Sequence, residues 1–160
     1  MQSETHSADD IGNLPGFLIR RCNQVAMAIF LDETSGFDLS PAQYGALSVV
    51  AADPGLDQTR LMERSALDRS SVTKCVERLE ARGLIRREVD PADRRVRRLY
   101  ITEPGQQLRT EVREHVLRSQ ARLLAPLGAE RATQLLAMLK ELADSHNAAS
   151  RVPLRDGDAA

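Results

Sequence analysis

A short stretch of the chain is rich in hydroxyl, ammonium and guanidinium groups, which can bind phosphate oxygens and the edges of nucleic-acid bases. The residues are Ser70, Ser71, Thr73, Lys74 and Arg78. Hydroxyl and amino donors suit phosphate and base acceptors, and an arginine can form two hydrogen bonds with guanine O6 and N7. A polar helix face is usually just solvated, so this group alone does not establish a nucleic-acid site.

A second basic group follows, in which four of five consecutive residues are arginines. They are Arg94, Arg95, Arg97 and Arg98. Guanidinium groups held so close together repel one another unless anions lie nearby, and the negative potential of a narrow minor groove attracts such groups. We therefore favour a nucleic-acid contact over an exposed charged loop without a partner.

The net charge of the whole chain conceals this basic centre. The 160 residues include 22 Lys and Arg and 23 Asp and Glu, a net charge of −1 that by itself argues against nucleic acid. Residues 60–100 nevertheless carry a net charge of +5, and the remaining residues carry −6. Such asymmetry indicates one basic face that contacts nucleic acid.

Helix-start motifs and hydrophobic periodicity predict the elements that position these groups. A first helix is expected from an Asn13 N-cap to about residue 36. The expected N-caps of later helices are Ser40 (in a capping box with Gln43), Asp57, Asp68 (or Arg69-Ser70) and Thr102. Residues 84–89 and 97–101 are expected to form a β-hairpin with the arginines at its tip. The long fifth helix is interrupted at Pro126 and Gly128, and a sixth begins near Glu130.

The third and fourth predicted helices are separated only by a break at Ala66-Leu67. The fourth helix is expected to bury one face, which carries Val72, Cys75, Val76 and Leu79, and to end at Gly83. The polar group of residues 70–78 lies on its other face. Two helices joined by a tight turn form a helix-turn-helix, whose second helix enters the major groove.

From Leu56 to Leu108 the chain resembles the winged helix-turn-helix of MarR-family transcription regulators. The resembling segments are 68–72, 78–85, 90–95 and 99–105, and residues 39–44 are similar to the start of the family's second helix. The resemblance covers about residues 13–146. It implies a mainly α fold with a small β-hairpin wing, a winged helix-turn-helix with N- and C-terminal dimerisation helices.

The resemblance also implies a domain organisation and a homodimer. Residues 13–37 and 103–146 are expected to be dimerisation helices and 38–102 the DNA-binding lobe, with disordered segments at 1–12 and 147–160. The outer helices carry apolar stripes that the lobe cannot cover, which agrees with a dimer. A two-fold dimer matches a palindromic operator in double-stranded DNA, with half-sites about 10 bp apart.

For the wing, the resemblance implies that Arg94 enters the minor groove and that Asp93 holds it by an ion pair, with Arg95 and Arg97 beside them. Such proteins are typically repressors, released from DNA by a small aromatic carboxylate or phenolic effector. The protein is therefore expected to be a ligand-responsive repressor.

Four residues are candidates for the effector site. Arg20 and Arg21 can form paired hydrogen bonds with a carboxylate, Tyr44 can wall the site, and His115 can add a polar contact. The alternative for each is a surface ion pair or an ordinary core position. Residues 14–21 and 54–58 are similar to a subgroup that controls nicotinate degradation, which suggests a hydroxylated nicotinate as the effector.

Two further hypotheses remain open. An oxidation-sensing repressor is one, because Cys22 lies on the first helix, although its place on the apolar stripe favours a buried, inert thiol. A protein-interaction module without DNA binding is the other, and it predicts no salt-dependent DNA affinity.

Other classes of protein are disfavoured. The three histidines (6, 115 and 146) have no metal-ligand spacing and no catalytic or nucleotide-binding motif occurs, so neither an enzyme nor a metal or other cofactor is expected. Cys22 and Cys75 form no disulfide framework, and no apolar run spans a membrane. A cytoplasmic location is therefore expected.

Overall fold

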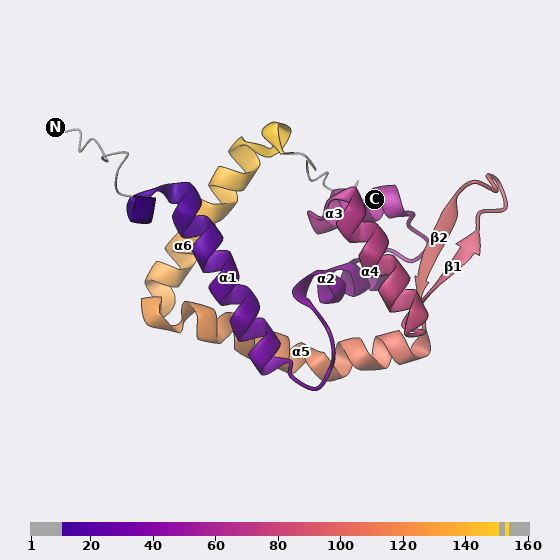
Figure 1. The fold of residues 1–160 in the computed structure, drawn as a ribbon, viewed down its shortest axis with the longest axis horizontal. Helices are drawn as coiled ribbons and strands as arrows, with labels where there is room; N and C mark the ends of the chain where they lie inside the picture. Colours follow the sequence, from indigo (N-terminus) through magenta and orange to yellow (C-terminus); the bar gives the residue numbers. More distant parts are fainter. Residues whose placement is uncertain (1–10, 151–152, 154–160) are drawn as a thin grey trace.

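The structure is a computed structural model that describes residues 11–150 and 153. It is mainly helical, with one two-stranded antiparallel sheet, as the sequence predicts. Figure 1 shows a lobe that contains α2, α3, α4 and the hairpin, joined by the long α5 to a region formed by α1, α6 and the far half of α5. The elements are α1 (Pro15–Glu33), α2 (Pro41–Ala52), α3 (Gln58–Ser65), α4 (Arg69–Ala81), β1 (Ile85–Val89), β2 (Arg97–Ile101), α5 (Glu103–Leu124) and α6 (Gly128–Ser145), with 3-10 turns at Ile11–Asn13, Ala125–Leu127 and Asn147–Ala149.

Four of the predicted helix starts are confirmed by side-chain caps. The hydroxyl of Ser40 accepts from the backbone N–H of Gln43, whose side chain accepts from the Ser40 N–H, at 3.2 and 2.9 Å. Asp57, Asp68 and Thr102 cap the next three helices in the same way. Each such cap contributes about 1 kcal/mol to helix stability.

The predicted start of the first helix is wrong. Leu14 occupies the N-cap position of α1, without a side-chain cap, and Asn13 lies in the preceding 3-10 turn. Pro15 at the first helical position sets φ for the helix and needs no N–H partner there, so α1 begins without a polar cap.

The expected disordered ends fall largely outside the described residues, since residues 1–10, 151–152 and 154–160 are not among them. Where the structure does describe these segments, it shows the 3-10 turns at Ile11–Asn13 and Asn147–Ala149.

The core lies inside the lobe. The predicted inner face of α4 is confirmed, since Val72, Cys75, Val76 and Leu79 are all buried. They pack with buried side chains of every neighbouring element, including Leu47, Val50, Leu61, Leu99 and Val112. The apolar face fixes which side of α4 turns outward.

The end of α4 is confirmed at Gly83, which has a φ of +69°. The N–H of Gly83 donates to Glu80 O and that of Leu84 to Leu79 O, a pair of bonds that satisfies the last carbonyls of a helix. A side chain at this φ is strained, so glycine is the residue that lets the chain turn directly into β1.

The hairpin runs in antiparallel register from Ile85 opposite Ile101 to Val89 opposite Arg97. Leu99 also exchanges backbone hydrogen bonds with the segment after α2, since Gly55 N–H donates to Leu99 O and Leu99 N–H donates to Leu56 O. The wing is thereby attached to the lobe along its second strand.

Outside the lobe, many large apolar side chains are exposed. They are Leu18, Ile19, Val25, Met27 and Leu31 on α1, Leu117 on α5, and Leu136, Met138, Leu139 and Leu142 on α6. No residue of α6 is buried. The stripes predicted on the first and sixth helices are largely exposed in the described part of the chain, whereas that of α5 is partly covered, since Val112 is buried in the core of the lobe.

Candidate nucleic-acid interface

The polar face of α4 points away from the core. Ser70 and Lys74 are exposed, and Ser71 and Thr73 are half-buried. The Thr73 hydroxyl donates to Arg69 O at 2.9 Å, a bond that leaves its oxygen able to accept. Because Val72 and Val76 anchor the opposite side, the helix presents this face as a rigid unit.

The cap of α4 is electrostatically favourable. The pKa of the Asp68 carboxyl is held below its ordinary value, chiefly by hydrogen bonding with Ser71 and also by the charge of Lys74. A carboxylate at a helix N-terminus is stabilised by the helix dipole. Asp68 is therefore ionised at neutral pH and fixes the first turn of α4.

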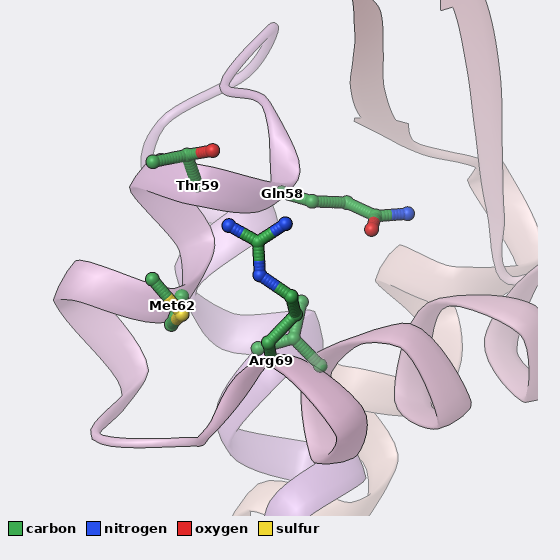
Figure 2. Close-up of a pocket in the computed structure, with 5 residues that line it drawn as sticks. Gln58, Thr59, Met62 and Arg69 are labelled. Carbon is green, nitrogen blue, oxygen red and sulfur yellow. The ribbon is translucent and has the colours of Figure 1, made fainter. Parts of the chain in front are cut away.

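Arg69 stands at the first position of α4 and was not among the predicted site residues. Figure 2 shows its guanidinium reaching toward the side of α3 that carries Gln58 and Thr59. These residues, with Met62 and Val72, line a hollow of about 40 Å³. Drug-sized ligands need several hundred Å³, so this hollow is too small for an aromatic acid. Arg69 could have been included from the sequence, because it is a basic residue directly before the polar group of α4.

Arg78 has a different environment from the rest of this group. It lies near the C-terminal end of α4, and its Nη2 is 3.3 Å from Oδ1 of Asp38 in the loop between α1 and α2. Its guanidinium therefore already has an anionic partner within the chain.

At the tip of the wing the predicted ion pair between Asp93 and Arg94 is wrong. Oδ1 of Asp93 accepts from the backbone N–H of Arg95 at 3.0 Å and lies 3.4 Å from its Nε. An aspartate readily bonds to the backbone two residues ahead in a turn, which directs its carboxylate to Arg95. Arg97 in turn donates to Arg94 O at 2.7 Å, so the tip is held by backbone acceptors.

A partly buried ionic contact of the wing lies where its strands end and the tip loop begins. Asp90, which is only 7% exposed, accepts from Nε of Arg98 at 2.6 Å and from the N–H of Ala92 at 2.7 Å. These bonds, the Ala92 N–H first and the Arg98 guanidinium second, lower the pKa of Asp90. Arg98 also donates to Gly55 O at 3.2 Å, so the pair fastens the hairpin to the turn after α2. Arg98 was expected among the arginines at the tip, and its pairing with Asp90 was not predicted.

The wing and the start of α3 lie together. Asp57, Gln58 and Thr59 face Arg95, Val96 and Arg97 across an open hollow of about 280 Å³. Hydroxyl, amide and guanidinium groups thus meet between the first turn of α3 and the arginine loop.

The four candidate effector residues lie in two places. Arg20 and Arg21 are exposed on α1, and Arg21 lines an open hollow of about 330 Å³ with Leu18, Val25 and Leu123. Arg20 stacks on Phe17, with its guanidinium carbon 5.5 Å from the ring centre.

Tyr44 of α2 and His115 of α5 lie near the C-terminal end of α1. The Tyr44 ring centre is 6.3 Å from that of Phe30, and Nδ1 of His115 is 2.8 Å from Glu33 O. Twelve residues of helix separate Arg21 from Glu33, about 18 Å along the axis. Within one chain, the structure does not bring the four candidates together.

The two cysteines differ in environment. Cys22 is exposed and borders the hollow beside Arg21, so the expectation of a buried thiol is wrong for the single chain. Its part of the apolar stripe faces outward because only one side of α1 packs on α5. Cys75 is buried in the core of the lobe, and burial raises its pKa.

Residues 11–150 and 153 contain neither a metal site nor a membrane span. Among them, no group of three or more His, Cys, Asp and Glu side chains lies close enough to hold a metal ion. In this part of the chain no helix combines the length and the apolar character that a bilayer crossing requires.

Comparison with known proteins points to one family. A sequence profile of the MarR family matches residues 37–96. A proposed transcriptional regulatory protein for the hcr operon of Thauera aromatica is 40% identical over 131 residues, which are 79% of this chain and 77% of that protein.

Two solved structures have a similar fold. The transcriptional repressor CouR, bound to a 23-mer DNA duplex, has 30% identity and a TM-score of 0.77, over 88% of this chain and 99% of that chain. BpsR of Bordetella bronchiseptica, whose DNA binding is regulated by 6-hydroxynicotinic acid, has 26% identity and a TM-score of 0.79, over 83% and 95%.

Proposed function

The chain belongs to the MarR family of transcription regulators, as its motifs indicate, and we propose that it binds a palindromic operator in double-stranded DNA as a homodimer. The relatives compared above are transcription regulators and not enzymes. A repressor acting in the cytoplasm is the proposed form of this regulation.

The outward polar face of α4 is the observation that carries the proposal. A helix whose apolar side is locked in a core and whose other side carries small donors fits the major groove. The wing arginines then reach the adjacent minor groove. The proposed DNA-contacting residues are Ser70, Ser71, Thr73, Lys74, Arg94, Arg95 and Arg97, with Asp93 orienting Arg95 rather than Arg94. Arg78 is left out of this set because its guanidinium pairs with Asp38.

The exposed apolar side chains of α1, α5 and α6 support the homodimer. Monomeric proteins rarely expose a contiguous apolar patch larger than a few hundred Å². A second copy of the same helices has the same apolar stripes and covers them by two-fold symmetry. We propose that residues 13–37 and 103–146 form this interface, with residues 38–102 as the DNA-binding lobe.

For the effector we propose a small aromatic carboxylate, with a hydroxylated nicotinate as the specific candidate. The hollow of about 330 Å³ beside Arg21 has the size of a small-ligand site and combines apolar walls with a guanidinium group, and we propose that the second copy closes it without filling it. BpsR, the relative that responds to 6-hydroxynicotinic acid, supports this class of ligand. Tyr44 and His115 remain proposed contributors only if the dimer brings them to the same site.

Operator binding is tested by fluorescence anisotropy with DNA from upstream of the protein's own gene and a scrambled duplex of equal length. We expect tighter binding to the first duplex, an affinity that falls steeply with salt, and release by 6-hydroxynicotinate or benzoate. Affinity that is independent of salt supports the protein-interaction module instead.

Oxidation sensing through Cys22 is the alternative trigger, and it requires that this thiol, which is exposed in the single chain, stays accessible to peroxide in the dimer. Treating the operator complex with hydrogen peroxide discriminates between the two triggers. If peroxide releases the wild type but not Cys22→Ser, and the aromatic acids release neither, the redox hypothesis replaces the effector hypothesis.

A further inference from the structure

The loop between α1 and α2, residues 34–40, is held by the C-terminal half of α4. The guanidinium of Arg82 donates to the backbone oxygens of Asp38 and Phe37, at 2.5 and 3.1 Å. Arg78, one helical turn earlier, pairs with the Asp38 carboxylate at 3.3 Å. Residues four apart on a helix share a face, so both arginines reach the same loop. We name this group, Arg78, Arg82, Asp38 and the Phe37 carbonyl, the loop clasp.

The loop conformation depends on these contacts. Asp38 has a φ of +46°, in the left-handed region that non-glycine residues rarely adopt. Such a conformation persists where the surrounding structure holds it. Beside it, Leu39 is buried, and the ring of Phe37 packs edge-on against His115 of α5 at 4.9 Å. Phe37 therefore contacts α5 through its ring and α4 through its carbonyl.

The two arginines of the loop clasp contribute unequally to its stability. The Arg78 and Asp38 side chains are 59% and 72% exposed, and an exposed ion pair contributes little to stability. Arg82 is half-buried and donates to two backbone carbonyls of the loop. Arg82 is therefore the main contact that holds the loop against α4. The charge of Arg78 beside it is neutralised by Asp38.

We propose that Arg82 is a positioning residue that sets the orientation of α4 relative to α1, and that Asp38 withholds Arg78 from DNA phosphates. The proposal rests on the proposed DNA binding. Arg82 acts through two backbone oxygens of the loop, so its removal lets α4, together with the lobe whose core holds it, shift relative to α1 without deleting a group that binds DNA. Arg78 already has an anion, so its removal leaves the phosphate contacts as they are.

The first experiment needs no DNA. Hydrogen–deuterium exchange is measured on the wild type, Arg82→Gln and Arg82→Lys, with Arg113→Gln on α5 as a matched surface control. We expect faster exchange at residues 35–40 in Arg82→Gln and an intermediate effect in Arg82→Lys, which keeps the charge but not the paired donors. Circular dichroism checks that each variant is folded. Unchanged exchange in both variants overturns the clasp, even if the protein binds no operator.

The second experiment uses the slope of log affinity against log salt, whose steepness changes by about 0.9 for each phosphate that the protein neutralises. We expect Arg78→Gln to keep the wild-type slope, whereas Lys74→Gln makes it shallower. Asp38→Asn tolerates the same backbone conformation but removes the charge that holds Arg78. It should steepen the slope by about 0.9, and the double variant Asp38→Asn/Arg78→Gln should restore the wild-type slope.

Arg82→Gln should weaken operator binding about tenfold at an unchanged slope, because only the placement of α4 is altered. A slope that becomes as shallow in Arg78→Gln as in Lys74→Gln overturns the withholding of Arg78. A protein that shows no salt-dependent operator binding contradicts the proposed function, while the exchange measurement still decides whether the clasp exists.

Discussion

Asp90 and Arg98 join the two strands of the wing where its tip loop begins, with Nε of Arg98 2.6 Å from Oδ2 of the nearly buried Asp90. The other carboxylate oxygen accepts from the Ala92 N–H, and Arg98 also reaches Gly55 O. The start of the tip loop is therefore tied to the turn after α2, and the arginines of the loop follow directly from it.

We predict that breaking this pair loosens the wing without unfolding the lobe. Arg98→Gln should speed hydrogen exchange at residues 90–96 and weaken operator binding roughly five- to tenfold. Arg113→Gln is the control, since Arg113 lies on α5, outside the wing, and pairs with the exposed Glu114 beside it. If both variants behave alike, the Asp90–Arg98 pair does not orient the tip loop.

Arg94 should contribute to DNA affinity without contributing to the dimer. Arg94→Gln is expected to weaken operator binding about tenfold or more, because a guanidinium in a narrow minor groove has a strongly favourable interaction. Light scattering should give the wild-type dimer mass. Anisotropy measures the affinity, and a wild-type value rejects the minor-groove assignment.

The apolar stripe on α6 should hold the dimer together. Leu139 and Leu142 are 44% and 53% exposed in the single chain, so glutamates there disturb no buried core. We expect Leu139→Glu/Leu142→Glu to elute as a folded monomer and to lose most of its operator affinity. Val89→Glu, which replaces an equally exposed apolar residue on β1, should remain a dimer. A double variant that stays dimeric places the interface elsewhere.

Stability should fall in acid partly through Asp53. Burial raises the pKa of this carboxyl, but hydrogen bonds from Arg60 and Arg64 lower it by more, so the native pKa lies below the ordinary one. Its contribution is therefore complete above about pH 4 and disappears as the pH falls through the native value.

The corresponding variant is Asp53→Asn. Its Tm at pH 7 should be about 2 °C below that of the wild type, a small effect because the pair is partly exposed. Between pH 5 and pH 3 the variant should lose less stability than the wild type does. Thermal denaturation at both pH values measures this, and equal losses rule out the ion pair as a source of acid sensitivity.

The features that could be predicted from the sequence are those that depend on residues close together in the chain. The caps at Ser40 and Asp68 and the helix end at Gly83 depend on neighbours three or four positions away, and the sequence contains them all. The apolar face of α4 follows from helical periodicity alone.

The features that sequence analysis missed depend on chain geometry between distant or competing partners. Arg78 and Asp38 are forty residues apart, so their pairing follows from the path of the loop and not from a local motif. At the wing tip, Asp93 had two arginines next to it, and the turn geometry selected Arg95. Cys22 is exposed because the opposite side of α1 lies against α5. The hydrophobic periodicity of the sequence does not specify which side packs there.

One junction of the fold has a mechanical consequence. Thr102 donates to Gly83 O through its hydroxyl and to Leu84 O through its N–H. A Cβ on Gly105 would lie 2.0 Å from the same Leu84 oxygen. These contacts hold together the end of α4, the start of β1 and the start of α5, with no space for a side chain at Gly105. From this junction α5 extends as a 22-residue helix, about 33 Å long.

Such a rod is a lever. A tilt of about 5° over its length displaces one end by about 3 Å, close to the 3.4 Å rise of one base pair in duplex DNA. Figure 1 shows α5 running from the outer helices α1 and α6 to the lobe that contains α4, so a small tilt at the outer helices is enough to move α4 by about one base pair along the DNA that we propose it binds.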